Sequence, residues 1–565
     1  MEKASNTKPE WASLKEISIG QWLMIIGVTL VFVAGFMLFE HRLGYRYDIG
    51  RLNNDTILYY IFYLLKTRPA ELQHTFLGQY RFPTLYFVSL ISPLISAFGL
   101  VQALVTLEAI IGVGYILLAF ISLYILTGYI GLSLAVAIFS VFPVLVFPVE
   151  SWAILSFPSM LPRTLFSVFY PPLFLGWLRW RQNPKLLLVL FFLIGLLSNI
   201  YPLTGLTMVS AMLLAQVVIG RFSWRAIGLA AMCGLASLIP MLPFAIDFIS
   251  YMRHAAPQGP GSVNPAELQK AFDYRLGLPT FSADQFAILF SPLAWMVFGG
   301  LGLASIQRSV KKDILFFIGA TLFIFGFIVA LNYLWLIPHG RSPFLLADFL
   351  RAPRQLVLPL VMMAALYIAQ QSKCTRRLWL TVLLGLSVIF IDCRTLARDI
   401  ISHAPLIRLI PHQIDSKKKE YGLSPSKQHK FWRKANMYDV ALWFKNNTSQ
   451  AHTLVHVSPV QQNDVTIYIL AFGCRAVTLD WNFFGTLYYA DRAEYVAWYR
   501  LFSRLNAIFQ EKGSCSPAEL QLITQHYPTI THVVCSTPVL SPMESPLNKL
   551  VYRNADFYVY EMGNP

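Results

Sequence analysis

The run 19-IGQWLMIIGVTLVFVAGFMLF-39 contains no charged residue. About 20 apolar residues are what an α-helix needs to cross the hydrocarbon core of a bilayer. No small-residue cleavage site follows, so we interpret this run as a retained membrane segment and not as a signal peptide. The composition agrees, because 13% of the 565 residues are charged and 56% are hydrophobic, whereas soluble domains carry about 25% charged residues. The sequence therefore predicts an integral membrane protein.

Apolar runs of this kind recur along the first part of the chain. They cover 19–39, 83–99, 102–126, 131–149, 164–178, 186–199, 202–220, 226–246, 286–306, 314–336, 354–371 and 377–396. Lys and Arg are concentrated in short loops on the cytoplasmic side of membrane proteins. The basic loops here are 179–185, 221–225, 307–313 and 370–377. The alternation predicts that 40–82, 246–285 and 337–353 face the opposite side of the membrane.

The same charge pattern limits the number of crossings. If the N-terminus is cytoplasmic, crossings by all twelve runs would return the C-terminal part to the cytoplasm. One apolar run must therefore not cross the membrane. We choose 83–99, because it is short and contains two prolines, which break or kink a helix. The alternative is a re-entrant 131–149, which two prolines also interrupt. The prediction is a polytopic α-helical domain over 1–399 with about eleven crossings and an outer loop at 40–82.

The composition changes near residue 400. Charges become frequent, and short β-type runs, TLVHV, AVTLD and THVVC, alternate with helix-like stretches such as 492–511. This pattern predicts a soluble α/β domain over 400–565. The loop charges place it outside the cytoplasm.

Charge and cysteine content exclude other classes. The net charge is +16, but no groove-reading or base-stacking motif accompanies it, so we expect no nucleic-acid partner. Surplus Lys and Arg suit cytoplasmic loops and contacts with anionic membrane lipids. The six cysteines form no CxxC pair, so no metal site is predicted. A disulfide among Cys474, Cys515 and Cys535 stays open.

The outer loop 40–82 carries a motif. An Asp and two Tyr follow at short helical spacing, and a Pro-Thr-Leu-Tyr run opens the next apolar segment. This order resembles the GT-C superfamily of membrane glycosyltransferases, specifically the protein mannosyltransferases and the aminoarabinose transferase of lipid A. The sequence departs at Thr56, where the family often has Glu, and at Thr84, where it has a second Pro. The matching residues are Asp55, Tyr59, Tyr60, Pro83, Leu85 and Tyr86.

The resemblance implies an enzyme of the bacterial plasma membrane. Its donor would be a sugar on a polyprenyl phosphate, and its acceptor an extracytoplasmic lipid, glycan or protein. Asp55 would act as base or would orient the acceptor, and a divalent metal is used by some superfamily members. Without the resemblance, Asp55 could equally be the N-cap of a helix beginning at Thr56.

Other polar residues of the outer face are candidates for substrate binding. Asp48 lies between two arginines and could form a solvated ion pair instead. Arg351 and Arg354 flank an apolar run, where they either anchor the helix at the interface or hold a lipid phosphate. Arg163 precedes another apolar run. Tyr201 lies in a turn between two apolar runs and could simply be part of a helical hairpin.

Two other functions compete with the transferase interpretation. A transporter or lipid flippase would place ionisable groups within the membrane, and the apolar runs are nearly free of charge. A non-catalytic assembly subunit with a GT-C-like fold would explain the missing acid at position 56. The sequence does not predict the oligomeric state.

Overall fold

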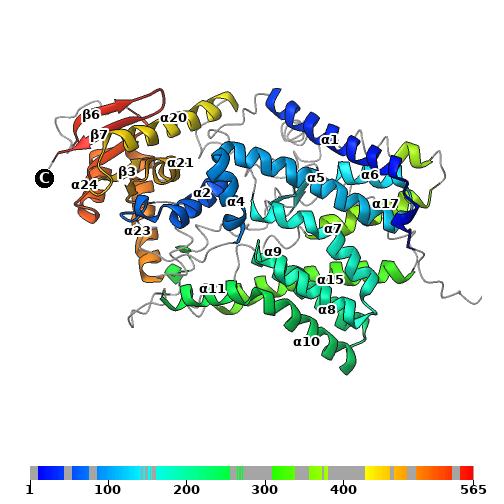
Figure 1. The fold of residues 1–565 in the computed structure, drawn as a ribbon. Helices are drawn as coiled ribbons and strands as arrows, with labels where there is room; N and C mark the ends of the chain where they lie inside the picture. The colour runs from blue at the N-terminus through cyan, green and yellow to red at the C-terminus, as the bar shows by residue number, and fades with distance from the viewer. Residues whose placement is uncertain are drawn as a thin grey trace, which may run out of the picture.

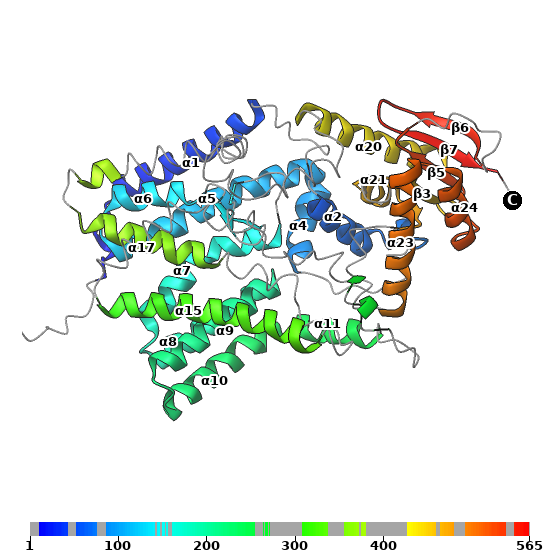
Figure 2. The same ribbon diagram turned by 180° about the vertical axis from the view of Figure 1, so that it is seen from behind.

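The computed structural model has a helical bundle at one end and a smaller domain with a β-sheet at the other (Figures 1 and 2). It describes residues 11–42, 52, 54–75, 86–141, 144–146, 150–152, 154–155, 161–254, 264, 266–268, 270–271, 308–336, 355–371, 375–379, 427–458, 464–479, 492–537 and 547–563.

The bundle is built from apolar helices, and short turns join those between Pro162 and His254. Three of them begin with Pro, whose fixed φ suits the first helical position and whose missing N–H costs nothing there. The helices are α1 (Ile19–Arg42), α2 (Asn54–Thr67), α4 (Tyr86–Phe98), α5 (Leu100–Thr127), α6 (Ile130–Phe139), α7 (Pro162–Trp180), α8 (Pro184–Ser198), α9 (Pro202–Ile219), α10 (Trp224–Leu238), α11 (Leu242–His254), α15 (Arg308–Ala330) and α17 (Val357–Ala369). Short turns add η1 (Leu14–Glu16), η3 (Pro69–Glu71), η5 (Ile239–Met241) and the π-helical η6 (Leu331–Leu336).

Membrane-spanning length is reached less often than the sequence predicts. Within the described ranges, three helices are long and apolar enough to cross: Ile19–Leu38, Leu100–Thr127 and Trp224–Ile249. Five more apolar helices have 10–17 residues, so each rises only about 15–26 Å at 1.5 Å per residue, against a hydrocarbon core of about 30 Å. The prediction of about eleven crossings is therefore wrong for these residues, because most of the apolar helices are shorter than a full crossing requires. The predicted segment 286–306 and most of 377–396 lie outside the described residues.

The two proline-containing runs have different structures. The first forms α4, which has 13 residues and ends at Gly99, whose φ of +77° is one that glycine adopts readily. The second is helical only over α6. It continues into an antiparallel hairpin of β1 (Val144–Val146) and β2 (Glu150–Trp152). The interpretation of 131–149 as one apolar segment is thus wrong, because the chain turns into strands after the helix.

The C-terminal region contains the predicted sheet and helices. A five-stranded sheet has the order β4-β3-β5-β7-β6. β3 pairs in parallel with β4 and β5, whereas β7 runs antiparallel to β5 and β6. The elements are α20 (Lys427–Asn447), β3 (Leu454–Ser458), α21 (Asp464–Tyr468), η9 (Ile469–Gly473, π-helical), β4 (Ala476–Val477), α23 (Arg492–Lys512), α24 (Pro517–His526), β5 (His532–Cys535), β6 (Leu547–Arg553) and β7 (Tyr558–Met562). The runs TLVHV, AVTLD and THVVC correspond to β3, β4 and β5.

A disulfide joins the beginning of α24 to the end of β5. It pairs Cys515 with Cys535, which the sequence left open among three cysteines. Cys474 is not part of this disulfide. It lies directly after η9 and is a free, buried thiol. The neighbouring Ser516 caps α24 by accepting a hydrogen bond from the Glu519 amide, in the Ser-x-x-Glu pattern of a capping box.

One hydrophobic core continues from the bundle into the C-terminal domain. Ile57 and Ile61 of α2 belong to the same buried cluster as Val440 of α20 and Tyr468 of α21. The part of the outer loop 40–82 that forms α2 therefore belongs to the hydrophobic core of the protein. This helix is packed between the bundle and the C-terminal domain.

Candidate functional site

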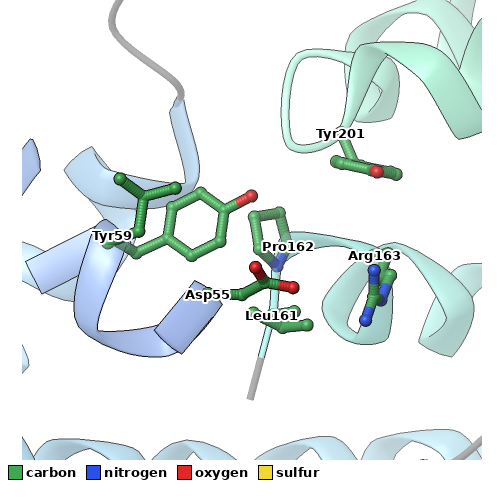
Figure 3. A pocket seen from close by; sticks show the side chains of 7 residues that line it. Asp55, Tyr59, Leu161, Pro162, Arg163 and Tyr201 are labelled. Carbon is green, nitrogen blue, oxygen red and sulfur yellow. The ribbon is translucent and has the colours of Figure 1, made fainter. Parts of the chain in front are cut away.

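A cavity of about 110 Å³ lies where the beginnings of three helices meet (Figure 3). One side is formed by the first turns of α2, and the other by the beginning of α7 and the turn that precedes α9. The lining residues are Asp55, Leu58, Tyr59, Leu161, Pro162, Arg163 and Tyr201. Four of these seven are site candidates from the sequence.

Local sequence explains why two helices begin at this cavity. Leu161-Pro162 and Tyr201-Pro202 each place a Pro at the first helical position. No side chain caps either helix, and the Thr164 and Leu165 amides donate to the Leu161 carbonyl. Since helix N-termini carry a partial positive charge, the α7 and α9 side of the cavity favours an anionic group, and the Asp55 carboxylate lines the other side.

Two hydrogen bonds through Gln355 connect α7 to α9. The Tyr170 hydroxyl of α7 donates to the Gln355 carbonyl over 2.6 Å. The Gln355 side-chain amide donates to the carbonyl of Thr204, in the first turn of α9, over 2.9 Å. Through Gln355, these bonds connect the middle of α7 to the first turn of α9.

Asp55 is the second residue of α2, since the helix begins at Asn54. The expectation that Asp55 caps a helix beginning at Thr56 is therefore wrong. Asp55 is solvent-exposed, and its position in the first turn is favourable because a carboxylate complements the positive end of the helix. Figure 3 shows the carboxylate between the Tyr59 ring and the beginning of α7.

Tyr59 and Tyr201 form the aromatic walls. Tyr59 lies one turn after Asp55 on the same face of α2, as i,i+4 spacing predicts. Its ring packs edge-to-face against Phe87 of α4, with centroids 5.4 Å apart. Tyr201 is 8% exposed and lies near Arg163 in Figure 3. Packed rings in these positions give the cavity fixed sides.

The other four substrate-binding candidates from the sequence do not line this cavity as the structure describes it. Tyr60 does not line it, because its ring stacks on Phe472 of η9 with centroids 5.4 Å apart. Burial raises the pKa of Tyr60 to about 12, so its hydroxyl stays protonated at neutral pH. Asp48, Arg351 and Arg354 lie outside the described residues.

Sequence reasoning missed several buried or lining residues. Leu58, Leu161 and Pro162 complete the cavity, and the Leu-Pro pair before an apolar run was a recognisable helix start. Glu108 is fully buried in the long apolar helix α5. It is an exception within apolar runs that are nearly free of charge, and it was visible as a single Glu within the run 102–126.

The cavity can hold one polar group of a substrate. Pockets that enclose a whole small molecule have about 300–1,000 Å³, so this volume suits a reacting head group. Among the described residues, no group of three or more His, Cys, Asp or Glu could hold a metal ion. In comparisons with known proteins, the chain matches no protein-family model and no curated protein sequence.

Proposed function

We propose that this protein is a membrane glycosyltransferase with a GT-C-like arrangement of membrane helices and a C-terminal domain outside the cytoplasm. It transfers a sugar from a polyprenyl phosphate to a lipid, glycan or protein outside the cytoplasm. The observation that carries the proposal is the cavity itself. Asp55, Tyr59, Arg163 and Tyr201 come from distant parts of the chain and line one small space.

The proposed chemistry divides between the two sides of the cavity. An acceptor hydroxyl attacks the anomeric carbon, the bond from that carbon to the phosphate oxygen breaks, and the lipid phosphate leaves as an anion. Asp55 accepts the hydroxyl proton as general base. Arg163 and the nearby beginnings of α7 and α9 stabilise the departing phosphate, as positive groups do where negative charge develops.

Contacts of the C-terminal domain support its position on the outer side. It bonds to the Leu52 and Ala70 carbonyls of the 40–82 loop and, through Tyr495, to the Ala271 carbonyl of the 246–285 loop. Both loops are predicted to be extracytoplasmic. The Cys515–Cys535 disulfide also suits an oxidising compartment.

Replacing Asp55 with Asn tests the proposed function. The substitution keeps the shape of the side chain and removes the base. Loss of a general base lowers rates by about 10²–10⁴. Purified Asp55→Asn protein should therefore fold normally and lose nearly all transfer from a polyprenyl-phosphate sugar to membrane acceptors.

The matched control is Asp439→Asn, because Asp439 is an exposed residue of α20 outside the cavity lining. It should retain wild-type activity. A wild-type rate for Asp55→Asn would remove Asp55 from the mechanism.

A lipid flippase or transporter is the second candidate, and Glu108 is the observation that favours it. Buried ionisable residues within membrane helices often mark a transport path, and Glu108 is 0% exposed in α5. Under this alternative, Glu108→Gln would abolish lipid translocation in vesicles, and Asp55→Asn would leave it intact.

A further inference from the structure

The helix that carries Asp55 lies against the C-terminal domain on the side away from the cavity. Tyr60 of α2 stacks on Phe472, and Phe472 meets Tyr438 of α20 edge-to-face with centroids 5.1 Å apart. In both ribbon views α2 lies at the junction of the bundle and this domain (Figures 1 and 2). The position of α2 thus depends on a part of the chain nearly 400 residues away.

Hydrogen bonds attach both ends of α2 to the same domain. Before the helix, the Lys434 ammonium donates to the Leu52 carbonyl oxygen over 2.8 Å, and Leu52 is fully buried. After the helix, the Gln450 side-chain amide donates to the Ala70 carbonyl over 3.2 Å and to that of Glu71. The main chain on both sides of α2 is therefore hydrogen-bonded to the C-terminal domain.

The bond from Lys434 is the one closest to Asp55. Leu52 lies three residues before Asp55, so this bond fixes the main chain directly ahead of the first turn. Hydrogen bonds to charged donors are stronger than neutral ones, and the Asp55 side chain itself is exposed. A general base must stay within hydrogen-bond reach of its proton, and a displacement of about 1 Å can lower a rate by about 10².

We propose that the C-terminal domain holds Asp55 in its reacting position and that Lys434 is the positioning residue. This inference rests on the proposed transferase function. Lys434 itself touches neither the cavity nor a reacting group. It acts through the main chain at Leu52 and the first turn of α2.

Hydrogen exchange tests the structural half of the inference without any substrate. Lys434→Met keeps an unbranched side chain and removes the donor. The amides of residues 58–60, which have acceptors within α2, should exchange about tenfold faster or more, the loss expected for one hydrogen bond from a charged donor. Amides of β3 and β5 should be unchanged, and Lys434→Arg should restore slow exchange over 58–60. Lys512→Met is the control, because Lys512 is an exposed residue at the end of α23.

Kinetics test the functional half. In Lys434→Met the kcat for sugar transfer should fall by about 10–100-fold, with the donor KM changed by less than about twofold because binding is intact. Lys434→Arg should recover most of the kcat. Unchanged exchange over 58–60 would overturn the inference, and so would faster exchange with an unchanged kcat. If the wild type transfers no sugar, the proposed function fails, while hydrogen exchange still decides whether Lys434 holds α2.

Discussion

Arg475 should be among the most sensitive residues of the C-terminal domain. Its side chain is nearly buried and joins the end of α20 to the segment that follows η9. Nε donates to Thr448 Oγ1 over 2.9 Å, and Nη2 donates to the Lys445 and Thr448 carbonyls over 3.0 and 2.6 Å. Nη1 donates to the carbonyls of Gly473 and Cys474 over 2.9 and 3.2 Å.

The expected cost of Arg475→Met follows from these partners. Gly473 and Cys474 are buried, so their carbonyls lose a donor that water cannot easily replace. A buried acceptor without a partner costs about 1–3 kcal/mol, which gives about 2–6 kcal/mol for the two. At about 2–4 °C per kcal/mol for a unit of this size, the thermal midpoint should fall by roughly 5–20 °C.

Thermal unfolding of the detergent-solubilised full-length chain measures the effect. Arg475→Lys should fall between the two proteins, since Lys has three donors where Arg has five. The control is Arg553→Met, which removes an exposed arginine from β6. A midpoint shift below about 2 °C for Arg475→Met would mean that water or rearranged neighbours satisfy the carbonyls. The proposed role of Arg475 would then be refuted.

Two further predictions concern the cavity and the pH dependence of stability. Arg163→Gln removes the Arg163 cation from the cavity, so kcat/KM for the polyprenyl-phosphate donor should fall about tenfold or more; an unchanged kcat/KM in steady-state kinetics would exclude a phosphate contact. Burial among Trp443 and Phe444 lowers the pKa of His532 below 6.5, although nearby Glu561 opposes the shift. The unfolded chain therefore binds the proton first, so stability is fully present above pH 6.5 and declines as the pH falls below it. The unfolding midpoint should drop between pH 7.5 and 5.5, and His532→Phe, which keeps the ring packing, should show a smaller drop.

The sequence alone determined the features that depend on local composition and periodicity. Apolar length identified α1 and α5 as helices long and apolar enough to cross a membrane, and β-type runs located β3, β4 and β5. Helical spacing placed Asp55 and Tyr59 on one face of α2. These features were accessible because each depends on residues within a few turns of one another.

Tertiary structure decided what depends on distant parts of the chain. The beginnings of α7 and α9 bring Arg163 and Tyr201 to Asp55, and no local pattern encodes that approach. Packing against Phe472 turns Tyr60 away from the cavity, and the fold of β5 beside α24 selects Cys535 as the partner of Cys515. The apolar run 131–149 forms a helix followed by a hairpin. Its hydrophobicity predicts burial but does not determine the conformation, because the hydrophobic effect has no direction. The conformation depends on close packing with side chains from other parts of the chain.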